Sequence, residues 1–221
     1  MKSLIFLLSI IIVTQVSCKS PNDTNGEAET VAQQTLLPVQ AETQDGLARA
    51  YFASGCFWCV EAIYESVEGV KDAISGYSGG TAENPTYQNH ADHAETVEVL
   101  YNPKVVSFDQ LVDVYFGSQN VTQVNGQGPD RGRSYRSILF YQNELEKKII
   151  DQKIAALNKQ LGNGEVAAQV LPFQTFWKAE NYHQDYERNN PDNPYIQNVS
   201  IPRLKTFQQK FPELLKNKEG H

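Results

Sequence analysis

The order of hydrophobic patterns between residues 48 and 141 constrains the fold more than any other feature of the sequence. Four stretches show the apolar runs or alternation typical of strands, and two stretches between them show helical spacing. The strands are expected in ARAYFASG from residue 48, VKDAISGYSGG from residue 70, ETVEVLY from residue 95 and YRSILFY from residue 135. One helix is expected from near Cys56 to before Gly69. The other spans VSFDQLVDVYFG, with Ser107 as its N-cap and Gly117 at its end.

This order is β-α-β-β-α-β, the split βαβ or ferredoxin-like arrangement. A long helix is expected in NELEKKIIDQKIAALNKQLG, then a strand in VAAQVLPF and a last helix over residues 200–216. The sequence therefore predicts an α/β (α+β) two-layer sandwich with a ferredoxin-like split βαβ core. Two long polar loops, residues 78–95 and 117–135, interrupt it. Loops of this length inside a compact domain are usually functional or disordered.

The N-terminus has the pattern of an export signal. Lys2 precedes the apolar run LIFLLSIIIV, which is too short for a transmembrane helix but typical of a signal peptide, here expected over residues 1–17. The following TQVSC resembles the lipobox of bacterial lipoproteins, although Gln15 stands where an apolar residue is usual. By that resemblance Cys18 is the lipid anchor. The alternative is an ordinary secreted protein whose Cys18 is removed or stays free.

Residues 18–46 are polar and poor in aromatic side chains, so we expect a flexible tether there and a catalytic domain over residues 47–216. The protein is then exported and lipid-anchored to the bacterial cell envelope, facing the periplasm in a Gram-negative cell. Disulfides can persist in such a compartment. The net charge of −7 argues against a nucleic-acid surface. We expect a monomer.

The stretch GCFWC, residues 55–59, carries the clearest chemical signal. Cys56 is expected at a strand-to-helix turn, where the helix dipole lowers the pKa of a thiol and makes it a better nucleophile. Cys59 follows one turn later and can reach Cys56 to form a disulfide. Two inert buried thiols, a thioredoxin-like pair and a zinc site completed by His90 and His93 remain alternatives. Zinc is disfavoured because a structural site usually needs two such cysteine pairs, so no metal is expected.

GCFWC, GYSGG, NPTY, HAETVEVLYNP, GQGPDRGRSYRS and AENYHQDY occur in this order between about residues 50 and 187. Together they resemble the type A peptide methionine sulfoxide reductases. The resemblance implies an α/β sandwich with a ferredoxin-like core. It also implies reduction of methionine S-sulfoxide, in oxidised proteins or peptides or as the free amino acid, without a bound cofactor.

The resemblance also assigns the reacting groups. Cys56 is the nucleophile, which attacks the sulfoxide sulfur and becomes a sulfenic acid. Glu95, in HAE, is the general acid, because a carboxyl group in an apolar pocket can hold a proton near neutral pH. Tyr87, in NPTY, and Tyr135, in GRSYRS, donate hydrogen bonds to the sulfoxide oxygen.

Three further residues match the substrate-binding positions of the family. Phe57 and Trp58 form aromatic walls that hold the S-methyl group, and Asp130, in GPDRG, orients substrate or water. From the sequence pattern alone, the aromatic pair could equally be core packing. His93 and His183 lie in family motifs, but we expect them to be structural hydrogen-bonding groups.

The sequence departs from the family pattern at Cys59, where many members have glycine and keep a resolving cysteine in the C-terminal tail. The tail here, LLKNKEGH, has none. The resolving thiol is then expected to be Cys59, with a thioredoxin-like protein or dithiol as external reductant. QNVTQ, in the second loop, also differs from the commoner His/Asp–Pro version. A disulfide oxidoreductase and a non-catalytic binding module remain as alternative functions.

Overall fold

The computed structural model of the chain describes residues 36–162 and 165–216. The chain divides into two units, residues 1–35 and 36–221, and the fold given below is that of the second. The predicted signal peptide over residues 1–17, Cys18 and most of the predicted tether lie outside the described residues. Within the described ranges, no helix has the length and apolar character needed to cross a membrane.

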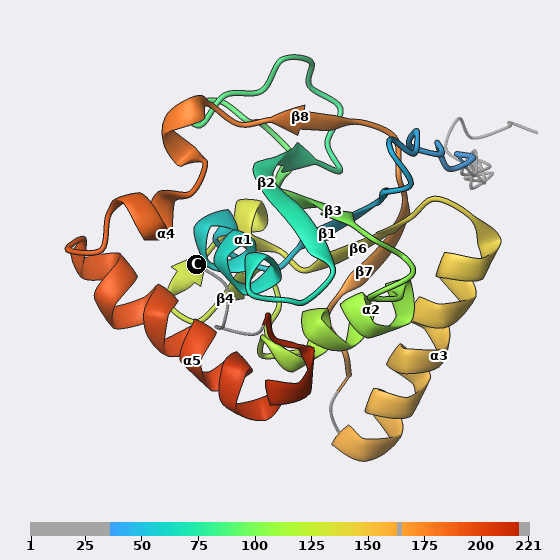
Figure 1. The fold of residues 1–221 in the computed structure, drawn as a ribbon. Helices are drawn as coiled ribbons and strands as arrows, with labels where there is room; N and C mark the ends of the chain where they lie inside the picture. Colours follow the sequence, from blue (N-terminus) through green and yellow to red (C-terminus); the bar gives the residue numbers. More distant parts are fainter. Residues whose placement is uncertain (1–35, 163–164, 217–221) are drawn as a thin grey trace, which may run out of the picture. The chain divides into compact units, whose positions relative to one another are not determined.

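A six-stranded sheet forms the centre of this unit, in the order β7-β6-β1-β3-β2-β8 (Figure 1). Its strands are β1 (Ala48–Ala53), β2 (Val70–Ser78), β3 (Ala94–Tyr101), β6 (Ile138–Tyr141), β7 (Gln169–Pro172) and β8 (Phe176–Lys178). Neighbouring strands are antiparallel except β6 and β7, which are parallel. In the central four, β6-β1-β3-β2, β3 lies between β1 and β2. The predicted ferredoxin-like split βαβ core is confirmed.

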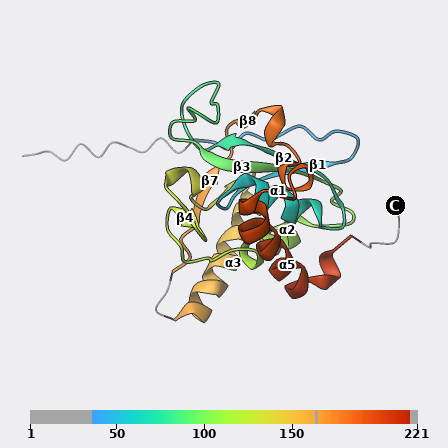
Figure 2. The same ribbon diagram turned by 90° about the vertical axis from the view of Figure 1, so that its left-hand side faces the viewer.

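Helices lie together on one side of this sheet, as both ribbon views show (Figures 1 and 2). They are α1 (Phe57–Glu65), α2 (Phe108–Gly117), α3 (Glu144–Leu161), α4 (Tyr186–Asn189) and α5 (Ile201–Lys210). Short 3-10 turns occur at Arg133–Tyr135, Asn181–His183 and Pro212–Leu214, and a π-helical turn at Ile196–Ser200 leads into α5. The main core lies between these helices and the sheet, where Phe52 of β1 stacks on Tyr64 of α1 with ring centroids 5.0 Å apart.

Local sequence signals account for the helix ends. Ser107 forms the predicted N-cap of α2: its hydroxyl accepts a hydrogen bond from the Gln110 N–H, and the Gln110 side chain bonds back to the Ser107 N–H. Asn143 caps α3, because its side-chain oxygen accepts a hydrogen bond from the Glu146 N–H. The helix predicted over residues 200–216 is shorter than expected. It ends at Lys210, because Pro212 starts a separate 3-10 turn.

The opposite face of the sheet carries a smaller apolar cluster that includes Tyr51 and Phe173, whose rings stack with centroids 3.8 Å apart. Residues 36–46 run along this side, where the Val39 N–H donates to the Phe173 carbonyl at 2.8 Å. Strand β8, which no sequence pattern indicated, extends the sheet beside β2. The second polar loop contains a two-stranded ribbon, β4 (Gly126–Gln127) and β5 (Asp130–Arg131).

Candidate active site

Cys56 lies at the turn between β1 and α1, where it is the N-cap residue of the helix. Gly55, just before it, has φ +79°, a conformation that favours glycine, and a Cβ there would lie 2.6 Å from Gln127 Cβ. The second polar loop therefore packs directly against this turn through Gln127. The Cys56 side chain is 6% exposed. The predicted position of Cys56 at the strand-to-helix turn is confirmed.

Cys59 lies one helical turn after Cys56 and is 1% exposed. Both thiols are free. The expectation that the pKa of Cys56 is lowered is wrong for this reduced pair. Burial and the neighbouring Cys59 thiol raise the pKa of Cys56, whereas the neighbouring Cys56 thiol lowers the pKa of Cys59 to about 6.

Burial is the largest cause of the raised pKa of Cys56, and another group occupies the free helix N-terminus. The Cys56 side chain makes no capping hydrogen bond. Instead, the Phe57 N–H at the first turn of α1 donates to a carboxylate oxygen of Glu95 at 2.9 Å. The helix dipole is thus directed at Glu95, and the Cys56 thiol is left in a buried, weakly solvated position.

Glu95 lies on β3 and is only 2% exposed. Burial raises the pKa of its carboxyl group to about 8, and the charges of Asp130 and Cys59 act in the same direction. The hydrogen bond from the Phe57 N–H opposes this shift but does not cancel it. Glu95 therefore holds a proton at neutral pH, next to the turn that carries Cys56.

Tyr87 and Tyr135 come from the two polar loops and are both half-buried. Burial raises the pKa of each hydroxyl, and the charges of Glu95 and Cys56 raise it further, so both stay protonated hydrogen-bond donors. The Tyr87 ring packs on Phe57, with centroids 6.4 Å apart. The structure thus brings both tyrosines to the same site as Glu95 and Cys56.

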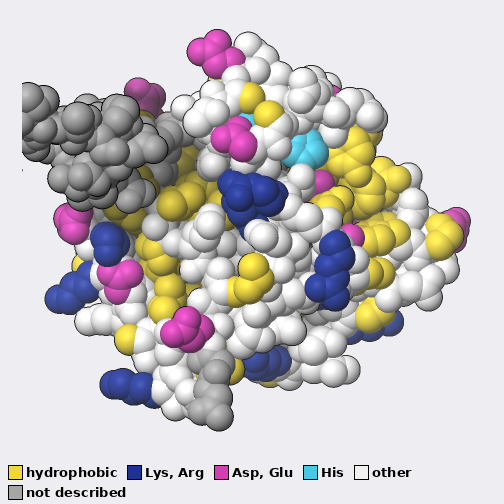
Figure 3. Space-filling model, turned by 180° about the vertical axis from the view of Figure 1, so that it is seen from behind, with side chains coloured by type: hydrophobic (Ala, Val, Ile, Leu, Met, Phe, Trp, Pro, Cys, Tyr) yellow, Lys and Arg dark blue, Asp and Glu magenta, His cyan; other side chains and the backbone are white. Residues whose placement is uncertain are grey.

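Phe57 and Trp58 differ in their surroundings. Phe57 is 1% exposed and packs against the aromatic rings around it, whereas Trp58 is half-buried. One face of Trp58 stacks on Tyr186, with centroids 3.7 Å apart, and its indole N–H donates to His183 Nδ1 at 3.1 Å. Hydrophobic side chains gather beside a histidine on the right of the space-filling view (Figure 3).

Asp130 lies on β5 and accepts a hydrogen bond from the Tyr195 hydroxyl at 2.7 Å. The Tyr195 oxygen also lies 3.6 Å from Cys59 Sγ, so it connects Asp130 with the second cysteine. Sequence reasoning missed the roles of Tyr195, Tyr186 and Arg203. Tyr186 ends the motif AENYHQDY and Arg203 lies in the predicted C-terminal helix, but neither signal indicates which element these residues contact. Their approach to α1 could be detected only from the tertiary fold.

His93 has the structural role that was expected of it. The Gly80 N–H donates to Nδ1 at 3.2 Å, and Nε2 donates to the Ala82 carbonyl at 2.7 Å. His90 Nε2 instead lies 2.7 Å from the Ser134 hydroxyl. Both ring nitrogens of His93 are therefore engaged in fixing the first polar loop.

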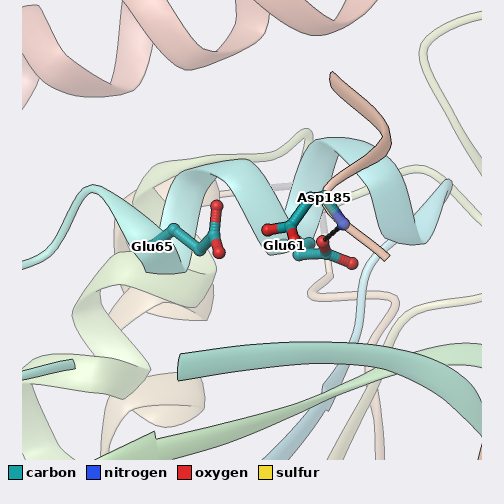
Figure 4. Close-up of side chains that lie close together, drawn as sticks. All are labelled: Glu61, Glu65 and Asp185. Atoms are coloured by element: carbon teal, nitrogen blue, oxygen red, sulfur yellow. Dashed lines mark hydrogen bonds between the residues drawn. The ribbon is translucent and has the colours of Figure 1, made fainter. Parts of the chain in front are cut away.

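Three carboxylate side chains lie close together outside the proposed site: Glu61 and Glu65 of α1, and Asp185 (Figure 4). Glu61 is 2% exposed and accepts hydrogen bonds from the Ser75 hydroxyl and the Asp185 N–H. Burial raises the pKa of both Glu61 and Glu65 to about 7. Glu61 therefore ties α1 to the segment that carries Tyr186, which stacks on Trp58.

The comparisons with known proteins agree with this geometry. The family model described as peptide methionine sulfoxide reductase matches residues 48–215. The peptide methionine sulfoxide reductase MsrA of Pasteurella multocida is 42% identical over 172 residues, covering 76% of this chain and 98% of that protein. The MsrA of Saccharolobus solfataricus is 38% identical over 175 residues, covering 77% and 98%.

Solved structures give the same result for the fold. The reduced form of Mxr1 from Saccharomyces cerevisiae has a TM-score of 0.64 at 29% identity, covering 72% of this chain and 94% of that one. Methionine sulfoxide reductase A of Corynebacterium diphtheriae has a TM-score of 0.59 at 29% identity, covering 71% and 83%. From the family match and these relatives, the chain belongs to the peptide methionine sulfoxide reductase family.

Proposed function

We propose that the protein reduces the S epimer of methionine sulfoxide, in proteins, peptides or as the free amino acid, with Cys56 as the nucleophile. One observation carries this proposal: the buried Glu95 carboxyl keeps its proton up to about pH 8 and lies at the first turn of the helix that Cys56 begins. A sulfoxide sulfur becomes electrophilic when its oxygen is protonated or strongly hydrogen-bonded. A thiol and a proton donor in one buried site meet that requirement.

The reaction uses each group once. Cys56 Sγ attacks the sulfoxide sulfur while Glu95 gives its proton to the oxygen, and the proton released by the Cys56 thiol returns to the Glu95 carboxylate. Tyr87 and Tyr135 donate hydrogen bonds to the same oxygen as the S–O bond breaks, because their hydroxyls remain protonated. The oxygen ends on Cys56 as a sulfenic acid, and methionine leaves. Cys56 is oxidised by two electrons, and the substrate is reduced by two.

We assign substrate binding to Phe57, Trp58 and Asp130. Phe57 and the half-buried Trp58 offer apolar ring surface to the S-methyl group, and Tyr186 fixes the Trp58 ring from its other face. Tyr195 holds the Asp130 carboxylate by a hydrogen bond of 2.7 Å. We assign Asp130 to orienting the substrate or a water molecule.

We assign the resolving step to Cys59. The two free thiols lie one helical turn apart, at the N-cap and in the first turn of α1, so Cys59 is placed to attack the sulfenic acid on Cys56. A Cys56–Cys59 disulfide forms, and the hydroxyl leaves as water. A thioredoxin-like protein or a small dithiol then reduces this disulfide by thiol–disulfide exchange. No tightly bound cofactor enters this scheme.

We further propose that the protein is exported and attached to the bacterial cell envelope by a lipid on Cys18. The apolar run LIFLLSIIIV followed by TQVSC supports this proposal. Cells fed a labelled fatty acid should label the wild-type protein but not Cys18→Ala. A wild-type protein that carries no label, and is recovered without membranes, would contradict the lipid attachment.

The function is tested by dithiothreitol-driven reduction of each epimer of a methionine sulfoxide peptide. Wild-type protein is expected to reduce the S epimer, and Cys56→Ser is expected to be inactive while retaining the wild-type circular dichroism spectrum. Without reductant, wild-type protein should release one methionine per chain. Disulfide reduction in insulin without turnover of either epimer would instead indicate a disulfide oxidoreductase.

A further inference from the structure

Two of the histidines in the described part of the chain are buried, and their ring nitrogens are used differently. Both nitrogens of His93 are bonded to the backbone of the first polar loop. His183, which is only 1% exposed, accepts the Trp58 indole N–H at Nδ1 at 3.1 Å. Among the described residues, its Nε2 has no hydrogen-bond partner. A histidine that only holds the fold together is expected to use both nitrogens, as His93 does.

The hydrogen bond from Trp58 fixes the tautomer of His183. An indole N–H can only donate, so Nδ1 must be free of a proton and Nε2 must carry it. Burial lowers the pKa of this ring, although the charge of Glu180 opposes the shift, so His183 is neutral at neutral pH. A carboxylate oxygen of Glu180 lies 3.9 Å from Nε2, a distance at which it attracts the N–H without forming a hydrogen bond.

Trp58 is held by two contacts of different kinds. Tyr186 stacks on one face, with ring centroids 3.7 Å apart and planes 8° apart, and His183 accepts the N–H at the edge. Stacking alone fixes the plane of an aromatic ring but allows the ring to slide and turn within that plane. The hydrogen bond to His183 removes this freedom, because it fixes the direction of the indole N–H.

His183 also lies beside the residues that surround the rest of the proposed site. Its ring centroid is 4.9 Å from that of Phe57 and 4.5 Å from that of Tyr87. Glu180 strengthens this connection, since one of its oxygens accepts the Tyr87 N–H at 2.9 Å and the other lies near His183 Nε2. One imidazole therefore contacts both aromatic walls assigned to the S-methyl group and a tyrosine assigned to the sulfoxide oxygen.

We propose that His183 is a positioning residue that selects for a small group on the substrate sulfur, because it fixes the Trp58 ring relative to Phe57 and Tyr87. The proposal rests on the proposed function, in which Phe57 and Trp58 hold the S-methyl group. His183 transfers no proton in this role. If Trp58 were free to turn, the methyl group would be held loosely and a larger S-alkyl group would fit.

The first measurement follows the hydrogen bond itself. The chain has two tryptophans, so protein labelled with nitrogen-15 gives two indole N–H resonances, and Trp177→Phe assigns the signal of Trp58. In His183→Phe the Trp58 signal should move and exchange faster with water, because phenylalanine has no acceptor. His183→Asn should bring the signal back towards its wild-type position, because the amide oxygen can replace Nδ1. The Trp177 signal is the internal control and should stay in place.

The second measurement follows substrate selection. The methionine burst, which is the single release of methionine without reductant, is compared with release of ethionine from the S epimer of ethionine sulfoxide. Ethionine has one more methylene on sulfur, which in a fitted apolar pocket typically costs about 10–200-fold in specificity. Wild-type protein and His183→Asn should prefer the methyl substrate. In His183→Phe this preference should fall about 10-fold, through a higher half-saturating concentration of the methyl substrate more than through a lower limiting rate.

Trp58→Phe provides an independent arm, because it removes the donor and leaves His183 in place. The preference for the methyl substrate should fall in this variant. Adding His183→Phe should then lower it no further, since both changes remove the same contact. A further loss in the double variant would show that His183 acts by another route, which contradicts the proposal. Should His183→Phe fail to fold, His183→Leu replaces it, because leucine also lacks an acceptor.

The proposal is overturned if folded His183→Phe keeps both the wild-type Trp58 resonance and the wild-type preference. It is also overturned if His183→Asn loses as much preference as His183→Phe, because packing of the ring and not its acceptor would then matter. Failure of the proposed function looks different. In that case wild-type protein releases no methionine from the S epimer, although the Trp58 resonance still responds to His183→Phe.

Discussion

A backbone hydrogen bond and burial act in opposite directions on the pKa of Glu95. The Phe57 N–H stabilises the carboxylate form, but burial outweighs it, and the pKa stays at about 8. We expect Glu95→Gln to lower the rate of the methionine burst by about 10²–10⁴-fold, the usual contribution of a general acid. The amide keeps the shape and can still accept the Phe57 N–H, so thermal unfolding should be nearly unchanged. A burst of wild-type rate in this variant would exclude Glu95 as the acid.

The wild-type burst should slow at alkaline pH. Above about pH 8 Glu95 loses the proton it must donate. The burst rate is therefore expected to fall as pH rises through about 8. Stopped-flow measurements from pH 5 to pH 9 test this. In Glu95→Gln the alkaline limb should disappear, whereas a limb that persists there would belong to another group.

Single residues were predictable from the sequence only where the signal was local. The spacing of Cys56 and Cys59 and the position of Cys56 before a helix follow from GCFWC and its neighbours. The direction of the Cys56 pKa shift did not, because its main cause is burial by the surrounding fold, with a smaller effect of Glu95, 39 residues away in the sequence. Tyr195, 136 residues from Cys59, was missed for the same reason.

Among the elements, the turn between β1 and α1 depends most on its sequence. Gly55 combines φ +79° with a close approach to Gln127, so Gly55→Ala introduces both backbone strain and a steric clash. We expect a loss of unfolding free energy of roughly 1–3 kcal/mol and a slower burst. Gly128→Ala is the matched control, since Gly128 also has positive φ, +55°, but a Cβ there meets nothing within 4 Å. Equal losses in denaturant unfolding would show that backbone strain alone matters.

The helices and long strands could be predicted because their signals are periodic and their ends are capped, as Ser107 shows for α2. Strand β8 could not, because it spans three residues and exists only through pairing with β2. Its approach needs Gly76, where a Cβ would lie 2.4 Å from Phe176 and from the Trp177 carbonyl. A glycine inside a strand indicates a close contact but does not identify the partner.

Across the whole described unit, the C-terminal segment is tied to the end of α1. The Glu68 N–H donates to the Leu214 carbonyl at 2.8 Å, and the Lys216 N–H donates to the Ser66 carbonyl at 2.9 Å. A chain that ends at Lys210 should lose roughly 2–4 kcal/mol of unfolding free energy, from these hydrogen bonds and the partly buried apolar residues after it. Hydrogen exchange should then accelerate at the Glu68 amide. Unchanged protection of that amide would contradict this role.

The carboxylates of Figure 4 should make global stability depend on pH. The pKa of Glu61 is raised from 4.5 to about 7 on folding, so the folded protein holds a proton that the unfolded chain has released. This contribution to stability is present at low pH and is lost as pH rises through about 7. Wild-type unfolding free energy should fall between about pH 4.5 and pH 7 more steeply than that of Glu61→Gln. Parallel curves for the two proteins would show that Glu61 does not titrate in this range.

The near-complete burial of Cys56, at 6% exposure, limits which damaged proteins can be repaired. A sulfoxide can reach this sulfur only if its whole side chain extends away from its own backbone, which a residue packed in a folded client cannot do. Repair therefore competes with refolding of the client, and an oxidised residue is reached only during local or complete unfolding. Turnover of a given client then reports how often its damaged segment opens. Oxidation that loosens a protein is thereby corrected sooner than oxidation that leaves the fold intact.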